Sequence, residues 1–351
     1  MSNLKKVVLI VIGILLFLVI VTGVLFAAAM HSLFGSTNYE TEPPTQAQTE
    51  TETETEILDI QTSEEGVFYI TETANEAKAE TEETEEKIPV ASDSDVYNIL
   101  LIGVDERPST GDTDSGTVML LSVNDSSRQR SMITLNRDLT VEVPGQGEMP
   151  LDQVYGAGGG TLTAETVTEN FRVLTERYMV IQFSQLVDIV DELGGIPVSI
   201  SQEELDPLNE NIRAICAQRS ESPDPYLLTE TGTQTCGGIQ AVAYSRIDQG
   251  EGDAQAVRQY EIISAVIGSL GDQSITGLYG AVRTVLSGVT HNVPELEILG
   301  LLVKVGRLSG YEELQETLPS TDLLVTEQTD SGEILTTDWT EAAREIQTAL
   351  Y

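Results

Sequence analysis

The sequence predicts an α/β (α+β) fold, in which helices sandwich a central mixed β-sheet, behind an N-terminal transmembrane helix. Between residues 97 and 270, apolar runs of strand length alternate with segments whose apolar residues recur at helical spacing. An uncharged apolar run fills residues 7–30, and an acidic, polar segment separates this run from the alternating region. These three observations divide the chain into an anchor, a spacer and a folded part.

The apolar run at residues 7–30 is the predicted anchor. As a helix it would be roughly 35 Å long at about 1.5 Å per residue, which matches the hydrocarbon layer of a bilayer. Lys5 and Lys6 precede it and an acidic segment follows, so the positive-inside rule places residues 1–6 in the cytoplasm and everything after His31 outside the cell. A cleaved signal peptide is the alternative. The run is longer than the usual apolar core of such peptides, which favours an uncleaved, single-pass membrane protein.

Residues 31–95 are predicted to form a disordered, Thr/Glu-rich stalk. Thr and Glu alternate strictly at residues 49–56, and such a segment has too little apolar surface to offset its ordering entropy. The apolar patch at residues 66–70 reads as a chance interruption, with a short strand or docking site as the alternative. The whole chain has 57 Asp+Glu against 18 Lys+Arg, a net charge of −39. This balance excludes nucleic acid as a partner, because phosphate backbones are bound by clustered basic residues.

The first half of the folded part is predicted to be rich in strands. Residues 97–104, 117–123 and 131–135 read as buried strands. Residues 139–143 alternate between apolar and polar side chains before a Pro144-Gly145 turn.

Further elements follow from periodicity and caps. Val167, Phe171, Leu174 and Tyr178 share one helical face, so residues 163–178 are predicted to be helical. A strand at 179–183 and a helix capped by Ser184 and closed by Gly194-Gly195 come next. The remaining expectations are a strand at 197–200, an irregular surface excursion at 201–235, helices at 254–270, 275–286 and 294–308, a strand at 323–325 and a last helix from Asp338 or Thr340. We expect residues 96–270 to form the extracellular domain and residues 271–351 a helical extension packed on it.

Two cysteines agree with an extracellular location. A disulfide between Cys216 and Cys236 would close a loop of about 20 residues, which stabilises by roughly 3 kcal/mol in the chain-entropy model. Two free buried cysteines remain the alternative, because two cysteines do not establish a disulfide framework.

Five short segments place charged residues or glycines directly after apolar runs. They are residues 98–107 (NILLIGVDER), 135–138 (LNRD), 155–160 (YGAGGG), 190–198 (VDELGGIPV) and 241–246 (AVAYSR), the last followed by Arg258-Gln259. Because α/β folds bind ligands beyond the carboxyl ends of their strands, we expect these arginines and a carboxylate to converge. Planar guanidinium groups suit a diphosphate, although they suit surface salt bridges equally well.

In order and spacing, these segments resemble the extracytoplasmic domain of the LytR-CpsA-Psr (LCP) family, also called the cell envelope-related transcriptional attenuator family. The resemblance covers residues 96–270. It implies an LCP-like fold and a membrane-anchored, Mg²⁺-dependent phosphotransferase of the Gram-positive envelope. Such an enzyme moves a teichoic acid-like or capsule-like glycopolymer from a polyprenyl-pyrophosphate carrier onto peptidoglycan or another wall acceptor.

The resemblance also implies roles for individual residues. Asp105 and Arg137 would be catalytic, and Asp105 would hold Mg²⁺ with Asp114 as a substitute second ligand. The residues implied to bind the pyrophosphate are Arg107, Arg137, Arg246, Arg258 and Gln259. An apolar groove for the polyprenyl tail is then expected beside Arg137 and Arg246.

Several positions depart from the family pattern, and the changes remove arginines and one metal-binding aspartate that the chemistry would use. Asp114-Ser115-Gly116 stands where the family has Arg-Ser-Asp, and Asp248 and Gln255 stand where it has arginines. Each lost charge-assisted bond removes roughly 1.5–3 kcal/mol of binding. The sequence therefore leaves two hypotheses: a divergent transferase, and a non-catalytic envelope scaffold or regulator that binds lipid-linked polymer without turnover.

Other catalytic classes fit poorly. The glycine-rich residues 155–160 lack the Lys-Ser or Lys-Thr ending of a nucleotide-binding P-loop. His31 and His291 are the only histidines, and neither has a sequence context for Ser-His or Cys-His catalysis.

Overall fold

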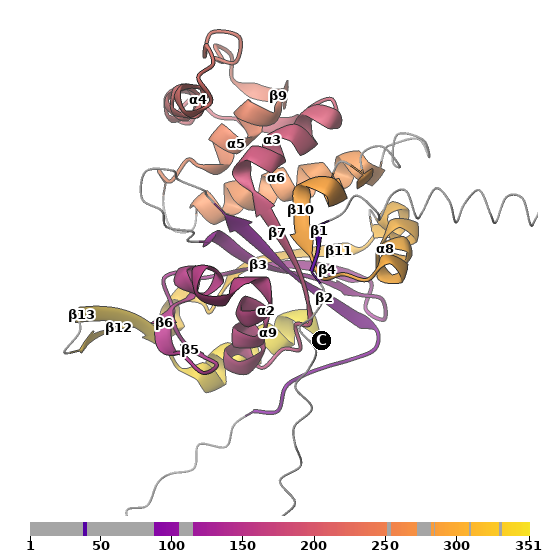
Figure 1. Cartoon of the computed structure of the whole chain (residues 1–351), viewed down its shortest axis with the longest axis vertical. Coiled ribbons are helices and arrows are strands. Elements are labelled where there is room, and N and C mark those ends of the chain that lie inside the picture. Colours follow the sequence, from indigo (N-terminus) through magenta and orange to yellow (C-terminus); the bar gives the residue numbers. More distant parts are fainter. Residues whose placement is uncertain are drawn as a thin grey trace, which may run out of the picture. The chain divides into compact units, whose positions relative to one another are not determined.

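The computed structural model describes residues 38–40, 88–104, 115–250, 254–271, 282–283, 285–308, 310–329 and 332–351. In this part of the chain, helices lie on both faces of a seven-stranded sheet with the strand order β1-β10-β7-β2-β3-β4-β11 (Figure 1). Parallel and antiparallel pairs both occur, so the predicted mixed α/β fold is confirmed. The predicted anchor at residues 7–30 lies outside the described residues. Within them, none of the helices has the length and apolar character needed to cross a bilayer.

The centre of the sheet consists of the predicted strands. They are β2 (Val96–Val104), β3 (Ser115–Asn124), β4 (Gln129–Leu135) and β7 (Arg177–Gln182). β2 runs antiparallel to β3 and parallel to β7, and β3 runs antiparallel to β4. The carboxyl ends of β2, β4 and β7 therefore meet at one end of the sheet, which is the arrangement that the candidate arginines require.

The C-terminal third of the chain completes the same sheet. β10 (Val289–His291) pairs with β7, and β11 (Glu312–Leu318) pairs in parallel with β4. Sequence analysis missed both strands, because β10 is short and β11 is a mostly exposed edge strand without an apolar run. Residues 271–351 are thus an integral part of the domain and not a helical extension that packs on a complete one.

One face of the sheet is covered by α2 (Leu151–Phe171) and α9 (Trp339–Leu350). Leu100, Ile102 and Val104 point to this face, where they share a buried core with both helices. Asp338 caps α9 as predicted, because its carboxylate accepts hydrogen bonds from the backbone N–H groups of Thr340 and Glu341.

Helix α2 differs from the predicted helix at both ends. It begins at Leu151 and not at residue 163, so the glycine-rich residues 155–160 lie within it, and the helix breaks at Gly158 and Gly159. A Cβ on Gly160 would come within 2.3 Å of the Tyr178 ring, so this glycine allows the close approach of α2 to β7. The helix ends at Phe171, before Leu174 and Tyr178, because Arg172 adopts a left-handed conformation.

The other face is covered by α6 (Ala254–Gly271), α8 (Glu295–Leu308) and a helical segment near Leu286. The predicted helices at 254–270 and 294–308 are confirmed, and the described residues of the predicted helix 275–286 are also helical at its end. Leu101, Met119 and Met132 point to this face and pack with residues of α6.

A second hydrophobic cluster is built from α3, β8, α4, β9 and α5. Their bounds are Phe183–Glu192, Ile196–Ile200, Leu205–Arg219, Gly232–Cys236 and Gly238–Ser245. The prediction of an irregular excursion at 201–235 was wrong, because α4 and β9 lie in it. Leu208, Ile212 and Ile215 bury one face of α4 at helical spacing, and Pro207 lies in its first turn, where proline is tolerated.

Both cysteines belong to this second cluster as free thiols, so the structure does not contain the predicted disulfide. Cys216 and Cys236 are buried, and burial raises the pKa of the Cys236 thiol to about 11. Because the thiolate is the reactive form, this burial keeps Cys236 inert near neutral pH.

Both ends of the predicted stalk pair with the folded domain. β1 (Asn38–Tyr39) pairs in parallel with β10, and the Glu40 N–H donates to the His291 carbonyl at 2.9 Å. Ala91 forms a bridge with Val173. The stalk predicted over residues 31–95 is therefore not a spacer along its whole length; residues 41–87, including the patch at 66–70, lie outside the described residues.

Two hairpins lie outside the main sheet. β5 (Thr140–Val143) and β6 (Gly147–Pro150) flank the predicted Pro144-Gly145 turn, and Gly145 has the positive φ of 72° that such a turn needs. β12 (Leu324–Thr329) pairs with β13 (Gly332–Thr337) and includes the strand predicted near residue 324.

Candidate functional site

Arg137 stands at the carboxyl end of β4. Its Nη1 donates to the Gly116 carbonyl of β3 at 3.4 Å, and its own carbonyl accepts the Asp152 N–H at 2.9 Å. The side chain is 44% exposed, and the nearest Asp138 carboxylate oxygen is 3.9 Å from its Nε. One contact thus places the guanidinium, the other holds the backbone of Arg137, and the side chain remains open to a ligand.

Arg246 reaches the same end of the sheet from a distant part of the sequence. It follows α5 directly, and its guanidinium carbon lies 4.8 Å from the centre of the Phe183 ring. Phe183 is the first residue of α3 and directly follows β7. A Cβ built on Gly116 would lie 3.5 Å from the Phe183 ring. Arg137 and Arg246 therefore contact two neighbours, Gly116 and Phe183, that touch one another. The structure brings these two predicted arginines together.

Arg258 has a different environment from the other two arginines. It is 8% exposed, its Nε donates to the Glu204 carboxylate at 2.8 Å, and its Nη1 donates to the Ile247 carbonyl at 2.9 Å. Burial alone would raise the pKa of Glu204, but hydrogen bonds from Ser201 and Arg258 hold that pKa below its usual value. Arg258 therefore holds the turn that follows Arg246, and the Glu204 carboxylate balances the charge of Arg258.

Asp105, Arg107 and Asp114 lie outside the described residues. Their chain neighbours Val104 and Ser115 are register partners across β2 and β3, at the end of the sheet where Arg137 stands. In the described part of the chain, three or more His, Cys, Asp or Glu side chains do not gather anywhere in a way that could hold a metal ion. Asp138 and Asp152 are the described carboxylates whose residues contact Arg137.

An apolar cavity of about 260 Å³ lies between the sheet and the α6/α8 layer. Its walls include Leu101, Met132 and Met179 from the sheet and Ile263 from α6. A smaller apolar cavity of about 50 Å³ shares Leu101 and Ile263 with it and continues to Phe183 and Gln259.

Because they share lining residues, the two cavities lie side by side, and together we call them the apolar path. Its smaller cavity is lined by the Phe183 ring, which lies beneath Arg246. This is the position in which the sequence predicted an apolar groove. Sequence reasoning did not identify the residues that line these cavities. The available signal was that both alternating faces of β2 are apolar, so the strand had to be covered on two sides.

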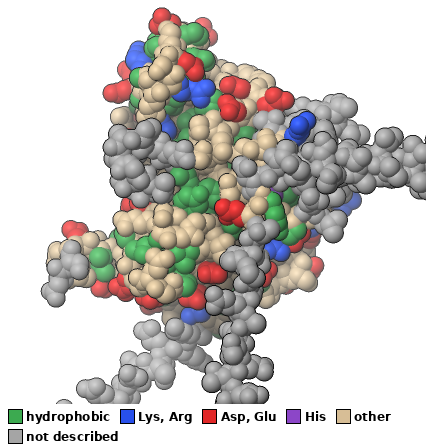
Figure 2. All heavy atoms as spheres, viewed as in Figure 1, with side chains coloured by type: hydrophobic (Ala, Val, Ile, Leu, Met, Phe, Trp, Pro, Cys, Tyr) green, Lys and Arg blue, Asp and Glu red, His purple; other side chains and the backbone are tan. Residues whose placement is uncertain are grey.

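On the face drawn in Figure 2, acidic side chains are scattered among neutral ones, and the coloured residues do not form a continuous basic patch.

Comparison with known proteins assigns this arrangement to a family. A match to the LytR_cpsA_psr family spans residues 66–342. The chain belongs to the LytR_cpsA_psr family. The resemblance inferred from its five segments is therefore confirmed, and the match extends beyond residue 270 because β10 and β11 belong to the same domain.

Curated relatives within the LytR_cpsA_psr family carry both enzymatic and regulatory names. The polyisoprenyl-teichoic acid–peptidoglycan teichoic acid transferase TagT of Bacillus subtilis is 26% identical over 229 residues, which cover 64% of this chain and 68% of that protein. Biofilm regulatory protein A of Streptococcus mutans is 28% identical over 252 residues, which cover 65% of this chain and 56% of that protein.

Solved structures of this family share the fold. A LytR-CPS2A-psr family protein, YwtF (TagT), with bound octaprenyl pyrophosphate lipid superimposes with a TM-score of 0.53 at 20% identity, over 76% of this chain and 94% of that one. Protein gbs0355 from Streptococcus agalactiae gives a TM-score of 0.56 at 25% identity, over 72% of this chain and 87% of that one.

Proposed function

We propose that this LytR_cpsA_psr protein is a glycopolymer transferase that moves a teichoic acid-like or capsule-like polymer from polyprenyl pyrophosphate onto a cell wall acceptor. The observation that carries the proposal is the apolar path, lined by the Phe183 ring beneath Arg246, with Arg137 at the same end of the sheet. A polyprenyl pyrophosphate has this pairing of properties, because a long apolar tail is joined to a doubly charged group.

The arginines have separate tasks in this proposal. Arg246 is held over the Phe183 ring, so its orientation is largely fixed before a ligand binds. Arg137 is exposed and can form two hydrogen bonds with phosphate oxygens. Fixed positive charges beside the diphosphate stabilise the charge that develops as the phosphoryl bond to the polyprenyl phosphate breaks and a bond to the acceptor hydroxyl forms.

The names of relatives support this assignment. TagT is named as a teichoic acid transferase, and structures of TagT are titled with octaprenyl pyrophosphate and with LI-WTA bound. We extend their chemistry to this chain, with a lipid-linked glycan as donor and peptidoglycan or another wall polymer as acceptor.

Mg²⁺ dependence, the anchor and the catalytic acid are further parts of the proposal. Asp105 and Asp114 are the proposed Mg²⁺ ligands, because carboxylate oxygens suit this ion and both residues adjoin a paired position of β2 and β3. Bound Mg²⁺ would neutralise phosphate charge. Asp105 is the proposed proton acceptor, Arg107 the proposed further phosphate contact, and residues 7–30 the proposed single-pass anchor that leaves the domain outside the cell.

One observation favours a second candidate function. Arg258 is engaged with Glu204 and Ile247, so one of the expected diphosphate ligands is occupied inside the protein. Together with Asp248 and Gln255 at positions where the resemblance implies arginines, this lowers the positive charge at the site. A protein with that deficit would bind lipid-linked polymer as a scaffold or regulator without transferring it.

A transfer assay with Arg137 variants tests the proposal. The full chain in detergent is mixed with a polyprenyl-pyrophosphate-linked glycan, Mg²⁺ and a peptidoglycan acceptor, and transfer of the labelled glycan is measured. We expect Arg137→Ala to lower transfer about 10- to 100-fold, because a charge-assisted bond contributes roughly 1.5–3 kcal/mol. The exposed Arg213 of α4 provides the control Arg213→Ala, which should retain full transfer. Lipid binding by the wild type without any transfer would overturn the enzyme and support the scaffold.

A further inference from the structure

The outer edge of the sheet is open along β11. In the strand order β11 is terminal and pairs only with β4. The Glu312 N–H donates to the Arg128 carbonyl at 2.9 Å, and the Leu318 carbonyl accepts the Asn136 N–H at 3.4 Å, so the even-numbered residues of β11 direct their backbone groups to β4. In a parallel ladder, the residues between them direct their backbone N–H and C=O groups away from the paired strand, here away from β4.

Those alternate residues are Glu313, Gln315 and Thr317. Across the described ranges, no hydrogen bond reaches a backbone N–H or C=O group of these three residues. Gln315 and Glu316 are exposed, so the edge is accessible at its middle. An accessible row of unpaired backbone groups is a template for the addition of another strand.

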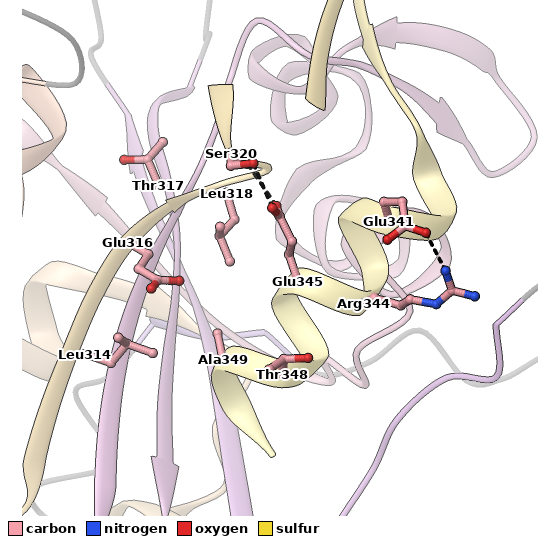
Figure 3. Close-up of a pocket in the computed structure, with 10 residues that line it drawn as sticks. All are labelled: Leu314, Glu316, Thr317, Leu318, Ser320, Glu341, Arg344, Glu345, Thr348 and Ala349. Carbon is pink, nitrogen blue, oxygen red and sulfur yellow. Dashed lines mark hydrogen bonds and ion pairs between the residues drawn. The ribbon is translucent and has the colours of Figure 1, made fainter. Parts of the chain in front are cut away.

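A groove runs beside this edge. A hollow of about 670 Å³ lies between β11 and one face of α9. Leu314, Leu318 and Ala349 supply apolar surface, while Glu316, Glu341 and Glu345 supply carboxylates (Figure 3). A strand that pairs with the β11 edge would direct every second side chain toward the α9 side of the sheet, where this groove can receive it.

The charge of the groove selects its occupant. Ser320 orients the Glu345 carboxylate with two hydrogen bonds: its N–H donates at 2.9 Å and its Oγ donates at 2.7 Å. Figure 3 shows Glu345 lying between α9 and β11. Glu341 pairs with Arg344, which is the one cation among the residues that line the groove. Glu316 has no ion pair within the described part of the chain. The groove therefore carries excess negative charge beside apolar surface, which complements a strand that alternates apolar and basic side chains.

Other occupants are disfavoured by the same charges. A second copy would place its own β11, with Glu312, Glu313 and Glu316, against this edge. The apolar patch at residues 66–70 of the chain is flanked by Glu64, Glu65 and Glu72. Like charges on facing strands destabilise the pair, so both alternatives bring repulsion where a basic segment brings attraction.

We propose that the β11 edge and the groove along α9 form a docking site for an extended, basic segment of a partner protein, bound by strand addition. Backbone hydrogen bonds to Glu313, Gln315 and Thr317 supply affinity, and Glu316 and Glu345 select lysine or arginine. The edge ends at Leu318, whose carbonyl accepts a hydrogen bond from Asn136, the residue before Arg137. A partner bound here therefore lies next to the candidate active site.

The test uses defined peptides and the full chain in detergent. A fluorescein-labelled Val-Lys-Val-Lys-Val-Lys peptide and its Val-Glu counterpart are titrated, and fluorescence anisotropy is measured. We expect the basic peptide to bind and the acidic peptide to bind at least about tenfold more weakly. Equal affinity of the two peptides, or no binding of the basic peptide, overturns the proposal.

Two variants at one position separate strand addition from surface adhesion. Gln315→Pro removes an outward N–H without touching the β4 ladder, so it should weaken the basic peptide about tenfold, whereas Gln315→Ala should change affinity less than twofold. Glu316→Lys should reverse the preference toward the acidic peptide. Unchanged binding by a folded Gln315→Pro protein overturns the proposal, as does self-association that the same variant abolishes, because a second copy would then be the occupant.

Hydrogen exchange supplies a measurement that depends on no variant. Bound peptide should slow the exchange of the amides of Glu313, Gln315 and Thr317 in the wild-type protein, while those of Leu314 and Glu316, already paired with β4, change little. Protection confined to other parts of the chain would contradict the assignment.

Discussion

Neighbouring residues of β2 lead into two different environments. Leu100, Ile102 and Val104 point into a dry core sealed by α2 and α9, where each is at most 2% exposed. Leu101, one residue away, lines the apolar cavities between the sheet and α6. Both environments are apolar, so hydrophobicity does not distinguish them. The difference is packing: the first face is filled by protein side chains, and the second keeps a space that a ligand can fill.

The two faces also differ in the kind of side chains that line them. The cavity face gathers Met119, Met132 and Met179, whose flexible, polarisable side chains adapt to ligands of irregular shape. The dry face is built mainly from branched aliphatic residues and aromatic rings such as Phe171. One sheet therefore has one closely packed face and one face with cavities, where we propose that the lipid binds.

Alanine substitutions at adjacent positions test this comparison most strongly. Leu100→Ala should lower the free energy of unfolding by about 3–5 kcal/mol, because a filled core cannot relax around the lost atoms. Leu101→Ala should lower the free energy of unfolding by only about 2 kcal/mol, because one side of Leu101 already faces a cavity. Urea denaturation of both proteins measures the difference. Equal costs would mean that the two faces are packed alike.

A substitution that fills the cavity tests the comparison through lipid binding. Ile263→Trp places a large ring in the wall shared by both cavities, so it should weaken polyprenyl pyrophosphate binding about 10- to 100-fold while the free energy of unfolding changes by less than about 1.5 kcal/mol. Binding is measured by displacement of a fluorescent polyprenyl lipid.

A matched variant on the dry face controls for the size of tryptophan. Ile346→Trp, in α9, overpacks a fully buried position and should destabilise the protein by about 1–3 kcal/mol without changing lipid affinity in the folded fraction. If the two variants weaken lipid binding equally, the cavity is not the tail site.

The smallest expected effect comes from a buried histidine on the cavity face. His291 pairs across the sheet with Met179, it is 1% exposed, and its ring lies edge-on to Tyr39 at 5.8 Å between centroids. Burial lowers the pKa of His291 below its usual 6.5, so the unfolded chain binds the proton more readily than the folded protein does. Stability should therefore be fully present above pH 6.5 and decline as the pH falls below that value.

Denaturation curves at pH 7.5 and 5.5 measure this decline, and His291→Phe should show a smaller difference between the two pH values. Hydrogen bonds from Ser201 and Arg258 lower the pKa of Glu204, and a hydrogen bond from Arg177 lowers the pKa of Glu297, so both carboxylates stay ionised throughout this window. If the wild type and His291→Phe lose the same stability between the two pH values, another group causes the pH effect.

The elements that sequence analysis found are those whose local pattern agrees with their final environment. β2, β3 and β4 are apolar runs, and the Pro144-Gly145 turn carries its own backbone preference, so each could be recognised without neighbours. β11 was missed because its partner, and not its composition, makes it a strand: Glu312–Leu318 is held by the ladder to β4. Helix α4 shows the apolar spacing of a helix, but its polar surroundings concealed it.

The candidate site divides in the same way. The order of motifs identified the family and predicted that Arg137 and Arg246 share a site. Arg137 lies just past β4, as that reasoning requires, whereas Arg246 follows helix α5 and reaches the same end of the sheet through its contact with Phe183. The pattern could not show that Arg258 binds Glu204, since that pair joins α6 to the start of α4, 54 residues apart in sequence. It also could not separate a free pair of cysteines from a disulfide, because both states bury sulfur at the same positions.

Taken alone, the amino-acid sequence determined the alternation of strands and helices, the acidic character of the chain and the family to which it belongs, because periodicity, charge and motif order are written locally. Only the tertiary structure decided which arginine is free to meet a ligand, where the apolar cavity lies and which sheet edge is open. Those properties depend on contacts between segments far apart in the chain, and the packing of distant side chains fixes them.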